Sequence, residues 1–258
     1  MKIVRTIAEL ELSGVVGLVP TMGALHDGHR SLFRAARAEN EVVVASLFVN
    51  PAQFDIAADL STYPRDEQRD TEIAAEEAVD VLFAPSVEEM YPTGFATWVD
   101  VGDVGAEGAE RPGHFRGVVT VCLKLFNIVQ PRHAYFGQKD AQQAAVLRRL
   151  VRDLNVPLEI RVLPTVRDDD GLALSSRNVQ LSNAERAEAL ALPRALTLGA
   201  ESYTQGGDPV AATHSAFNGI PPDYVELLEF DGLTILASAL RVGKTRLIDN
   251  VLLKGELS

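Results

Sequence analysis

Two histidines three residues apart, in a turn with a glycine, are the side chains of this chain best suited to chemistry. His26 and His29 flank Gly28 and follow the apolar run Val15–Val19. The next segment, Arg30–Glu39, has the spacing of an amphipathic helix. A helix begins with unpaired N–H groups and a positive dipole end, so a strand, a turn and a helix in this order make an anion site. Imidazole donors there predict phosphate binding, and histidines that only cap the helix are the structural alternative.

A second polar turn follows another apolar run, 41–49. Asn50 and Gln53 offer amide donors and acceptors, which suit the hydroxyl and carboxylate groups of a small substrate. Ordinary turn formation around Asn50-Pro51 is the alternative use of these residues.

Two later loops add positive charge and hydroxyl groups. Lys139 stands where a helix is expected to begin, so it could bind a phosphate together with the free N–H groups there. Asp140 beside it could be simply an N-cap. Ser175, Ser176 and Arg177 form a loop that could bind polyphosphate oxygens and neutralise a leaving pyrophosphate.

Apolar runs that alternate with helical segments predict the framework for these loops. Strands are expected at 15–19, 41–49, 79–84, 133–136 and 158–163, and helices at 30–39, 66–78, 118–129 and 141–152. Because the strands are apolar throughout, we expect a Rossmann-like α/β fold, with a parallel sheet and helices on both of its faces. Ligands bind beyond the carboxyl ends of such strands, which is where the polar loops fall: 20–29, 50–55, 137–140 and 165–177.

The chain changes character after Asn178, and we place the domain boundary before residue 166, to within about ten residues. Residues 1–165 are expected to form the Rossmann-like catalytic domain, and residues 166–258 a smaller α/β lid domain. The second part has a helical stretch at 184–203 interrupted at Pro193, and strand-like runs at 224–230 and 246–253.

The overall charge limits the partners of this chain. A formal net charge of −12 repels nucleic acid, so we expect no DNA or RNA partner. A cleft can still concentrate positive charge for a small anion, and eight basic residues are candidates for it: Arg111, His114, Arg116, Lys124, Arg132, His133, Lys139 and Arg177.

The apolar segments also bear on location. None of the apolar runs is long enough to span a bilayer, and the amino terminus lacks the apolar core of a secretory signal. We therefore expect a cytoplasmic protein with no membrane partner. The single cysteine, Cys122, lies in an apolar segment and is expected to be a buried thiol.

Eight motifs carry a resemblance to a known family. The histidine turn and the distant serine–arginine loop resemble the paired HIGH and KMSKS motifs of a nucleotidyltransferase superfamily. Within it the chain resembles the pantothenate synthetase (pantoate–beta-alanine ligase) family from about residue 15 to 253. The motifs are PTMGALHDGH (20–29), FVNPAQF (48–54), YPR (63–65), RPGHFRGV (111–118), FGQKDAQQ (136–143), PTVR (164–167), LSSRN (174–178) and TRLIDN (245–250).

The resemblance implies an ATP-dependent ligase that condenses (R)-pantoate with beta-alanine to pantothenate. The pantoate carboxylate would attack the α-phosphate of ATP and give pantoyl adenylate and pyrophosphate. Beta-alanine would then attack the acyl carbon and expel AMP. The resemblance further implies Mg2+ with ATP and a homodimer.

The resemblance also assigns residues to these tasks. Catalytic residues would be His26, His29, Lys139, Ser175, Ser176 and Arg177, with His29 at the position of the family's proton donor. The ATP site would include these six and Met22, Gly23, Ala24, Leu25, Asp27, Gly28, Gly137, Gln138, Asp140, Val166 and Leu174. The organic substrates would be held by Gln53, Gln143, Asn50 and Arg111. It assigns no metal ligand, and Asp70 is only a weak candidate.

Three positions depart from the family pattern, and two other functions share parts of it. Leu174 replaces a usual methionine, Gln138 a common glutamate, and Arg69 an acidic residue often found beside Asp70.

A nucleotidyltransferase that acts on a phosphorylated metabolite would share the histidine turn. A non-catalytic nucleotide sensor would keep the cavity without turnover.

Overall fold

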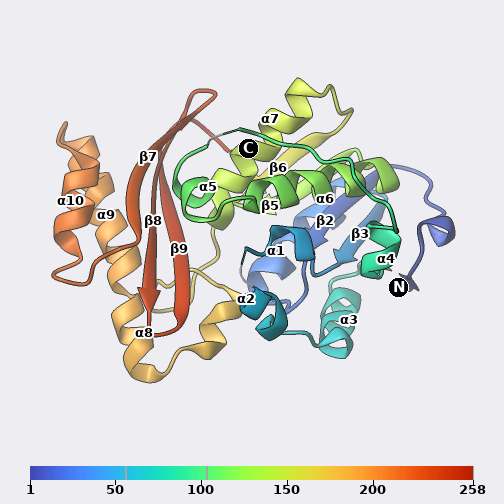
Figure 1. The fold of residues 1–258 in the computed structure, drawn as a ribbon, viewed down its shortest axis with the longest axis horizontal. Helices are drawn as coiled ribbons and strands as arrows, with labels where there is room; N and C mark the ends of the chain where they lie inside the picture. Colours follow the sequence, from blue (N-terminus) through green and yellow to red (C-terminus); the bar gives the residue numbers. More distant parts are fainter. Residues whose placement is uncertain (56, 103, 258) are drawn as a thin grey trace.

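The computed structural model describes residues 1–55, 57–102 and 104–257, which form two sheets with helices around them (Figure 1). The larger sheet has the order β1-β4-β3-β2-β5-β6, and every neighbouring pair is parallel. Its strands are β1 (Lys2–Val4), β2 (Val16–Thr21), β3 (Val42–Leu47), β4 (Val81–Phe83), β5 (His133–Gly137) and β6 (Glu159–Leu163). The expected Rossmann-like parallel sheet is confirmed.

The helices have the following bounds. They are α1 (Asp27–Glu39), α2 (Ala57–Thr62), α3 (Glu67–Glu76), α4 (Val87–Met90), α5 (Ala106–Glu110), α6 (His114–Val129), α7 (Ala141–Asp153), α8 (Asn183–Ala189), α9 (Ala191–Thr204) and α10 (Pro209–Ala216). Short 3-10 turns are η1 (Ile7–Glu9), η2 (Pro51–Gln53), η3 (Gln138–Asp140) and η4 (Ser176–Gln180). No helix among the described residues has both the length and the apolar character needed to cross a membrane.

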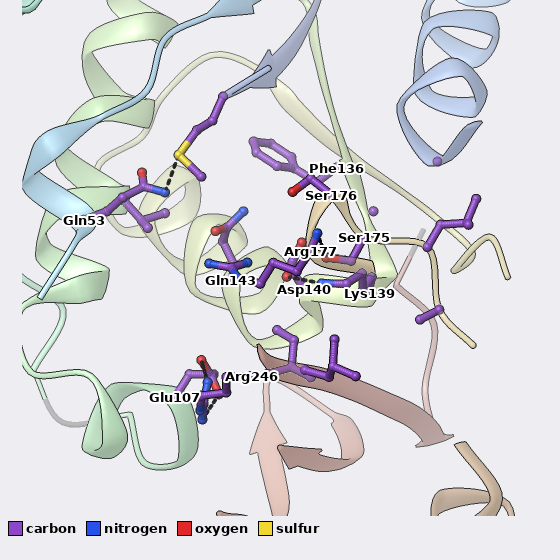
Figure 2. A pocket seen from close by; sticks show the side chains of 18 of the residues that line it. Gln53, Glu107, Phe136, Lys139, Asp140, Gln143, Ser175, Ser176, Arg177 and Arg246 are labelled. Atoms are coloured by element: carbon purple, nitrogen blue, oxygen red, sulfur yellow. Dashed lines mark hydrogen bonds and ion pairs between the residues drawn. The ribbon is translucent and has the colours of Figure 1, made fainter. Parts of the chain in front are cut away.

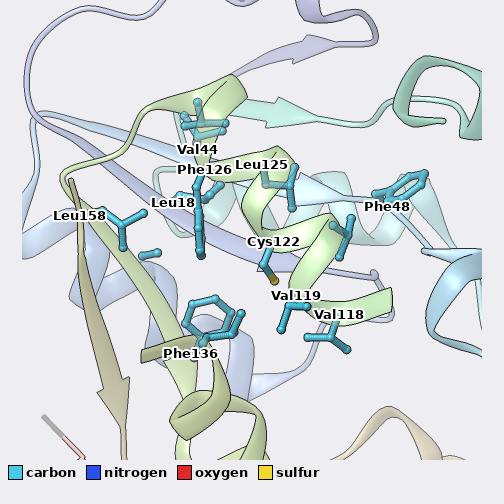
Figure 3. Close-up of a cluster of buried hydrophobic side chains, with 14 of the residues drawn as sticks. Leu18, Val44, Phe48, Val118, Val119, Cys122, Leu125, Phe126, Phe136 and Leu158 are labelled. Atoms are coloured by element: carbon cyan, nitrogen blue, oxygen red, sulfur yellow. The ribbon is translucent and has the colours of Figure 1, made fainter. Parts of the chain in front are cut away.

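Helices cover both faces of the larger sheet, which explains its continuously apolar strands. In β2, Leu18 packs with α6 residues such as Cys122 and Phe126 on one face (Figure 3). Its neighbour Val19 packs with Phe33 of α1 on the other face. Burial raises the pKa of the Cys122 thiol to about 12, as expected for a buried structural cysteine.

The order of the strands determines where a ligand can bind. From β2 the chain moves outward to β3 and β4 and then returns to place β5 on the other side of β2. The connections that follow β2 and β5 therefore run in opposite directions, and a crevice forms outside the carboxyl ends of these two strands. The histidine turn follows β2, and the Lys139 loop follows β5.

The second sheet is antiparallel and packs between two layers of helices. It consists of β7 (Tyr224–Phe230), β8 (Leu233–Val242) and β9 (Thr245–Lys254). On one face, Leu236 and Leu240 pack with α9; on the other, Ile235 and Ala237 contact Ala141 at the start of α7. Thus β8 is buried on both faces.

Three features of the C-terminal part differ from expectation. Strand β8 and helix α10 were not predicted. The helical stretch is interrupted at Leu190 rather than at Pro193. Pro193 lies in the first turn of α9, where a backbone N–H has no partner within the helix and its loss costs little.

Candidate active site

A cavity of about 490 Å³ lies at the carboxyl ends of the parallel strands and is closed on one side by β9. All four predicted loops contribute to it. Sixteen predicted site residues line it, several of which are drawn in Figure 2. They are Met22, His26, Gly28, His29, Asn50, Gln53, Arg111, Gly137, Lys139, Asp140, Gln143, Val166, Leu174, Ser175, Ser176 and Arg177.

Five predicted residues lie outside the lining of this cavity: Gly23, Ala24, Leu25, Asp27 and Gln138. Leu25 belongs to the core on the α1 face, and the side chain of Asp27 is 79% exposed. Gln138 faces β9 through its backbone carbonyl, which accepts from the Asn250 amide at 2.9 Å. These residues shape the loops around the cavity.

The histidine turn both caps a helix and faces the cavity. His26 Nδ1 accepts the N–H of Gly28 at 3.1 Å, and His29 Nδ1 accepts the N–H of His26 at 3.3 Å. A neutral imidazole that accepts at Nδ1 carries its proton on Nε2. We therefore assign the Nε2–H tautomer to both rings, which leaves two N–H donors for a ligand. The capping and phosphate-binding interpretations are compatible.

Both imidazoles are neutral near pH 7. Burial, with a further contribution from Lys139, lowers the pKa of His26 to about 4. Burial and the neighbouring His26 lower the pKa of His29 to about 3. The resting site therefore offers hydrogen-bond donors at these positions, and its fixed positive charge comes from other residues.

That positive charge comes from a lysine and arginines on separate elements. Lys139 Nζ lies 3.3 Å from Asp140 Oδ1. Burial disfavours ionisation of Asp140, but Lys139 and Arg177 outweigh this and hold the pKa of that carboxyl below its usual value. The Ser175 hydroxyl caps η4 by accepting the N–H of Arg177 at 3.3 Å. The cavity can thus bind a polyanion although the chain is acidic.

Half of the eight predicted basic residues line the cavity, namely Arg111, His114, Lys139 and Arg177. The other four have partners elsewhere, and their prediction as cleft residues was wrong. Arg116 lies 4.9 Å from the Trp98 ring centre and Lys124 5.0 Å from that of Phe95. The remaining two contacts are Arg132 to Glu159 at 2.9 Å and His133 to Asn40 at 2.8 Å.

The amide loop faces the histidine turn across the cavity. The Gln53 carbonyl accepts from Arg111 at 3.2 Å and lies 2.8 Å from His114 Nδ1. Gly117 packs so closely that a Cβ there would lie 2.2 Å from the Ala52 carbonyl oxygen. Arg111, just after α5, together with His114 and Gly117 of α6 therefore fixes the backbone that presents Gln53.

Comparison with known proteins identifies the family. The family model for pantoate-beta-alanine ligase matches residues 1–252. The chain belongs to this family. It is similar to pantothenate synthetases from Roseiflexus castenholzii, 51% identical with coverage of 98% of this chain and 100% of the relative, and Moorella thermoacetica, 53% identical with coverage of 93% and 91%.

Solved structures of pantothenate synthetases share the fold. That from Thermus thermophilus matches with a TM-score of 0.91 and 47% identity, over 98% of this chain and 99% of that one. The pantoate-beta-alanine ligase from Francisella tularensis, complexed with beta-gamma ATP and beta-alanine, matches over 100% of both chains with a TM-score of 0.84 and 37% identity.

The TRLIDN motif of this family member lies in β9 and contacts segments outside its own sheet. Arg246 pairs with Glu107 at 2.7 and 2.9 Å (Figure 2), and Asp249 pairs with Arg167 at 2.6 and 3.0 Å. Asn250 donates to the carbonyl of Lys139 at 2.9 Å. The motif was noted in the sequence without a role for its residues. Their partners lie far away in the chain, so no local pattern could reveal them.

Asp70 of α3 braces the histidine turn. Its oxygens accept the N–H groups of Ala24 at 2.9 Å and Leu25 at 2.7 Å, and the residue is 1% exposed. Ala24 has a φ of 52° and Gly23 of 83°, so this turn adopts a backbone conformation that needs support. Asp70, a weak metal candidate in the sequence, thus has both oxygens engaged. Among the described residues, no group of three or more His, Cys, Asp or Glu could hold a metal ion.

Substitution of Asp70 by Asn should disturb the histidine turn. One acceptor becomes an NH2 group that faces a backbone N–H, which should cost about 1–3 kcal/mol of stability. We expect turnover to fall at least about tenfold because the imidazoles shift. Turnover and urea denaturation measure the two effects. Glu72→Gln, on an exposed position of α3, is the control; equal turnover in Asp70→Asn and wild type would exclude the brace.

The buried histidines should make the fold sensitive to mild acid. In the unfolded chain a histidine binds a proton near pH 6.5, whereas the folded-state pKa values are about 4 for His26 and His114 and about 3 for His29. Protons therefore favour the unfolded state, and the free energy of unfolding should fall as pH drops from about 6.5 to about 4. Urea denaturation across this range should show a smaller fall for His29→Asn than for wild type. An equal fall would contradict the assignment.

Proposed function

We infer that the chain catalyses the ATP-dependent condensation of (R)-pantoate with beta-alanine to pantothenate, through a pantoyl-adenylate intermediate. The observation that carries this function is the arrangement within one cavity. Histidine donors, Lys139 and Arg177 suit a polyphosphate, and the amide of Gln53 suits a carboxylate or hydroxyl group. Both reactants of a carboxylate adenylation thus have complementary groups in one cavity.

Adenylation solves the leaving-group problem of a carboxylate. A carboxylate oxygen of pantoate attacks the α-phosphorus, the bond to the β-phosphate breaks, and pyrophosphate leaves. The beta-alanine amine then attacks the acyl carbon and AMP departs, while the amine loses its protons to solvent. Phosphoryl transfer needs mainly positioning and charge stabilisation, which this cavity offers.

The roles of individual residues form part of this proposal. The Nε2–H groups of His26 and His29 donate to phosphate oxygens, and Lys139 and Arg177 neutralise the charge that develops on pyrophosphate. The ATP site is completed by the Met22–His29 turn, Gly137–Asp140, Val166 and Leu174–Ser176. The organic substrates are held by Gln53 and Gln143.

We propose further features from the family resemblance. Mg2+ enters with the ATP phosphates, and we assign it no protein ligand; the oxygens of Asp70 accept N–H groups of the histidine turn. Residues 166–258 act as a lid domain over the catalytic domain 1–165, and the protein works as a homodimer in the cytoplasm. A gel-filtration mass of one chain would reject the homodimer.

Product analysis tests the proposed function. The purified protein with ATP, pantoate and beta-alanine should release AMP and pyrophosphate, with AMP formation dependent on both organic substrates. No AMP under these conditions would reject the ligase. A nucleotidyltransferase would instead release pyrophosphate only when a phosphorylated metabolite is supplied as its second substrate. A sensor would bind ATP without releasing AMP.

A further inference from the structure

We propose that the Tyr91 hydroxyl, which lies outside the cavity lining, positions the substrate-binding amide of Gln53 through Asn50. Tyr91 donates to Asn50 Oδ1 at 2.8 Å, and Asn50 Nδ2 donates to Gln53 Oε1 at 3.1 Å. This inference rests on the proposed function, in which Gln53 holds pantoate. It makes Tyr91 a positioning residue for that substrate.

The orientation of the Asn50 amide is determined by its neighbours. Besides Tyr91, Oδ1 accepts the N–H of Ala52 at 3.3 Å, and Nδ2 also donates to the Gly117 carbonyl at 3.1 Å. A backbone N–H can only donate and a carbonyl can only accept, so the reversed amide would be mismatched on both sides. Asn50 is 1% exposed, and its two donors and two acceptor sites are all used within the protein. We therefore assign it a positioning role, in place of the substrate contact expected from the resemblance.

The fixed Asn50 amide determines which face of Gln53 a substrate meets. Because Gln53 Oε1 accepts from Asn50, its Nε2 group is left to face the opposite side, 3.0 Å from the Met22 sulfur (Figure 2). Thioether sulfur is a weak acceptor, which a carboxylate or hydroxyl oxygen can replace. Gln53 thus presents a donor to pantoate, as an anionic substrate requires.

Aromatic contacts hold Tyr91 in place for this role. Its ring centre lies 6.2 Å from that of Phe48, 5.0 Å from Phe95 and 5.9 Å from Trp98. Burial raises the pKa of the Tyr91 phenol, so the hydroxyl keeps its proton and remains a donor. Without the Tyr91 hydroxyl, Asn50 Oδ1 would keep only one of its two donors. The Gln53 amide, which the Asn50 amide orients, would then be held less firmly in place.

The test removes one hydroxyl and compares substrates. Tyr91→Phe should lower kcat/KM for pantoate about fivefold, the effect of one lost hydrogen bond, and change KM for ATP less than about twofold. The matched control is Tyr135→Phe. Tyr135 is buried, and its hydroxyl also contacts an asparagine, Asn40 at 2.7 Å. Unlike Asn50, Asn40 does not line the cavity. The control should leave both substrate parameters unchanged, even if it lowers stability.

A double-mutant cycle distinguishes positioning from a general structural effect. In a Gln53→Ala background, Tyr91→Phe should not lower kcat/KM for pantoate any further, because the amide that Tyr91 positions is gone. The inference would be overturned if Tyr91→Phe lowered kcat/KM for pantoate as much in the Gln53→Ala background as in the wild type. It would also be overturned if Tyr91→Phe lowered kcat/KM equally for ATP and for pantoate. Unchanged kinetics of Tyr91→Phe in an otherwise active enzyme would overturn it as well. Failure of the wild type to form AMP would instead reject the proposed function.

Discussion

Substitution of His29 by asparagine is expected to slow adenylate formation about a hundred- to a thousandfold while the fold persists. The asparagine Oδ1 can take the place of the imidazole Nδ1, which accepts the N–H of His26 at 3.3 Å. The side chain ends there and has no counterpart of the Nε2–H donor. The variant therefore keeps the helix cap and removes only the proposed contact with phosphate.

A glutamine at the same position provides the complementary control. Its amide nitrogen can reach the place of Nε2, but it has no acceptor at the place of Nδ1. We expect His29→Gln to recover part of the rate and to be less stable than His29→Asn. Single-turnover release of pyrophosphate from ATP and pantoate measures the rate, and urea denaturation measures stability. Wild-type turnover in His29→Asn would remove the role assigned to this residue.

Substitution of Lys139 by methionine should have the second-largest effect. The side chain is 19% exposed and lies in η3, just before α7, so its charge is only partly screened by solvent. A lost cation at a phosphate site should lower kcat/KM for ATP about a hundredfold. After burial, Lys139 is also the main cause of the low pKa of His26, so that pKa should rise in the variant.

Two readouts make the Lys139 prediction specific. Steady-state kinetics at varied ATP gives the loss in kcat/KM, and NMR titration of the His26 ring gives its pKa. Lys254→Met, at the exposed end of β9, should change neither. An unchanged His26 pKa together with wild-type kinetics would show that the Lys139 charge does not act in the cavity.

The sequence predicts the elements whose signals are local. Apolar runs indicated β2 to β6 because strands buried on both faces, such as β2 with Leu18 and Val19, are apolar throughout. Placing the polar loops at the carboxyl ends of these strands follows from parallel topology. Strand β8 was not predicted, although 233–242 is similarly apolar and is buried on both faces as β2 is, so the same pattern could have indicated it.

What the sequence could not predict depends on side-chain direction. Arg116 and Arg111 are close in the chain, but only Arg111 faces the cavity. Asp70 had the appearance of a metal ligand, and only the folded structure shows its oxygens on the N–H groups of the histidine turn. Similarly, the Nε2–H tautomers of the histidines follow from backbone contacts that no residue pattern encodes.

The most direct test of the proposed chemistry is exchange of labelled pyrophosphate into ATP with beta-alanine left out. If pantoate is adenylated first, we expect exchange that requires pantoate, with AMP appearing only when beta-alanine is added. Exchange that requires beta-alanine, or no exchange by a folded protein that forms pantothenate, would contradict a pantoyl-adenylate intermediate.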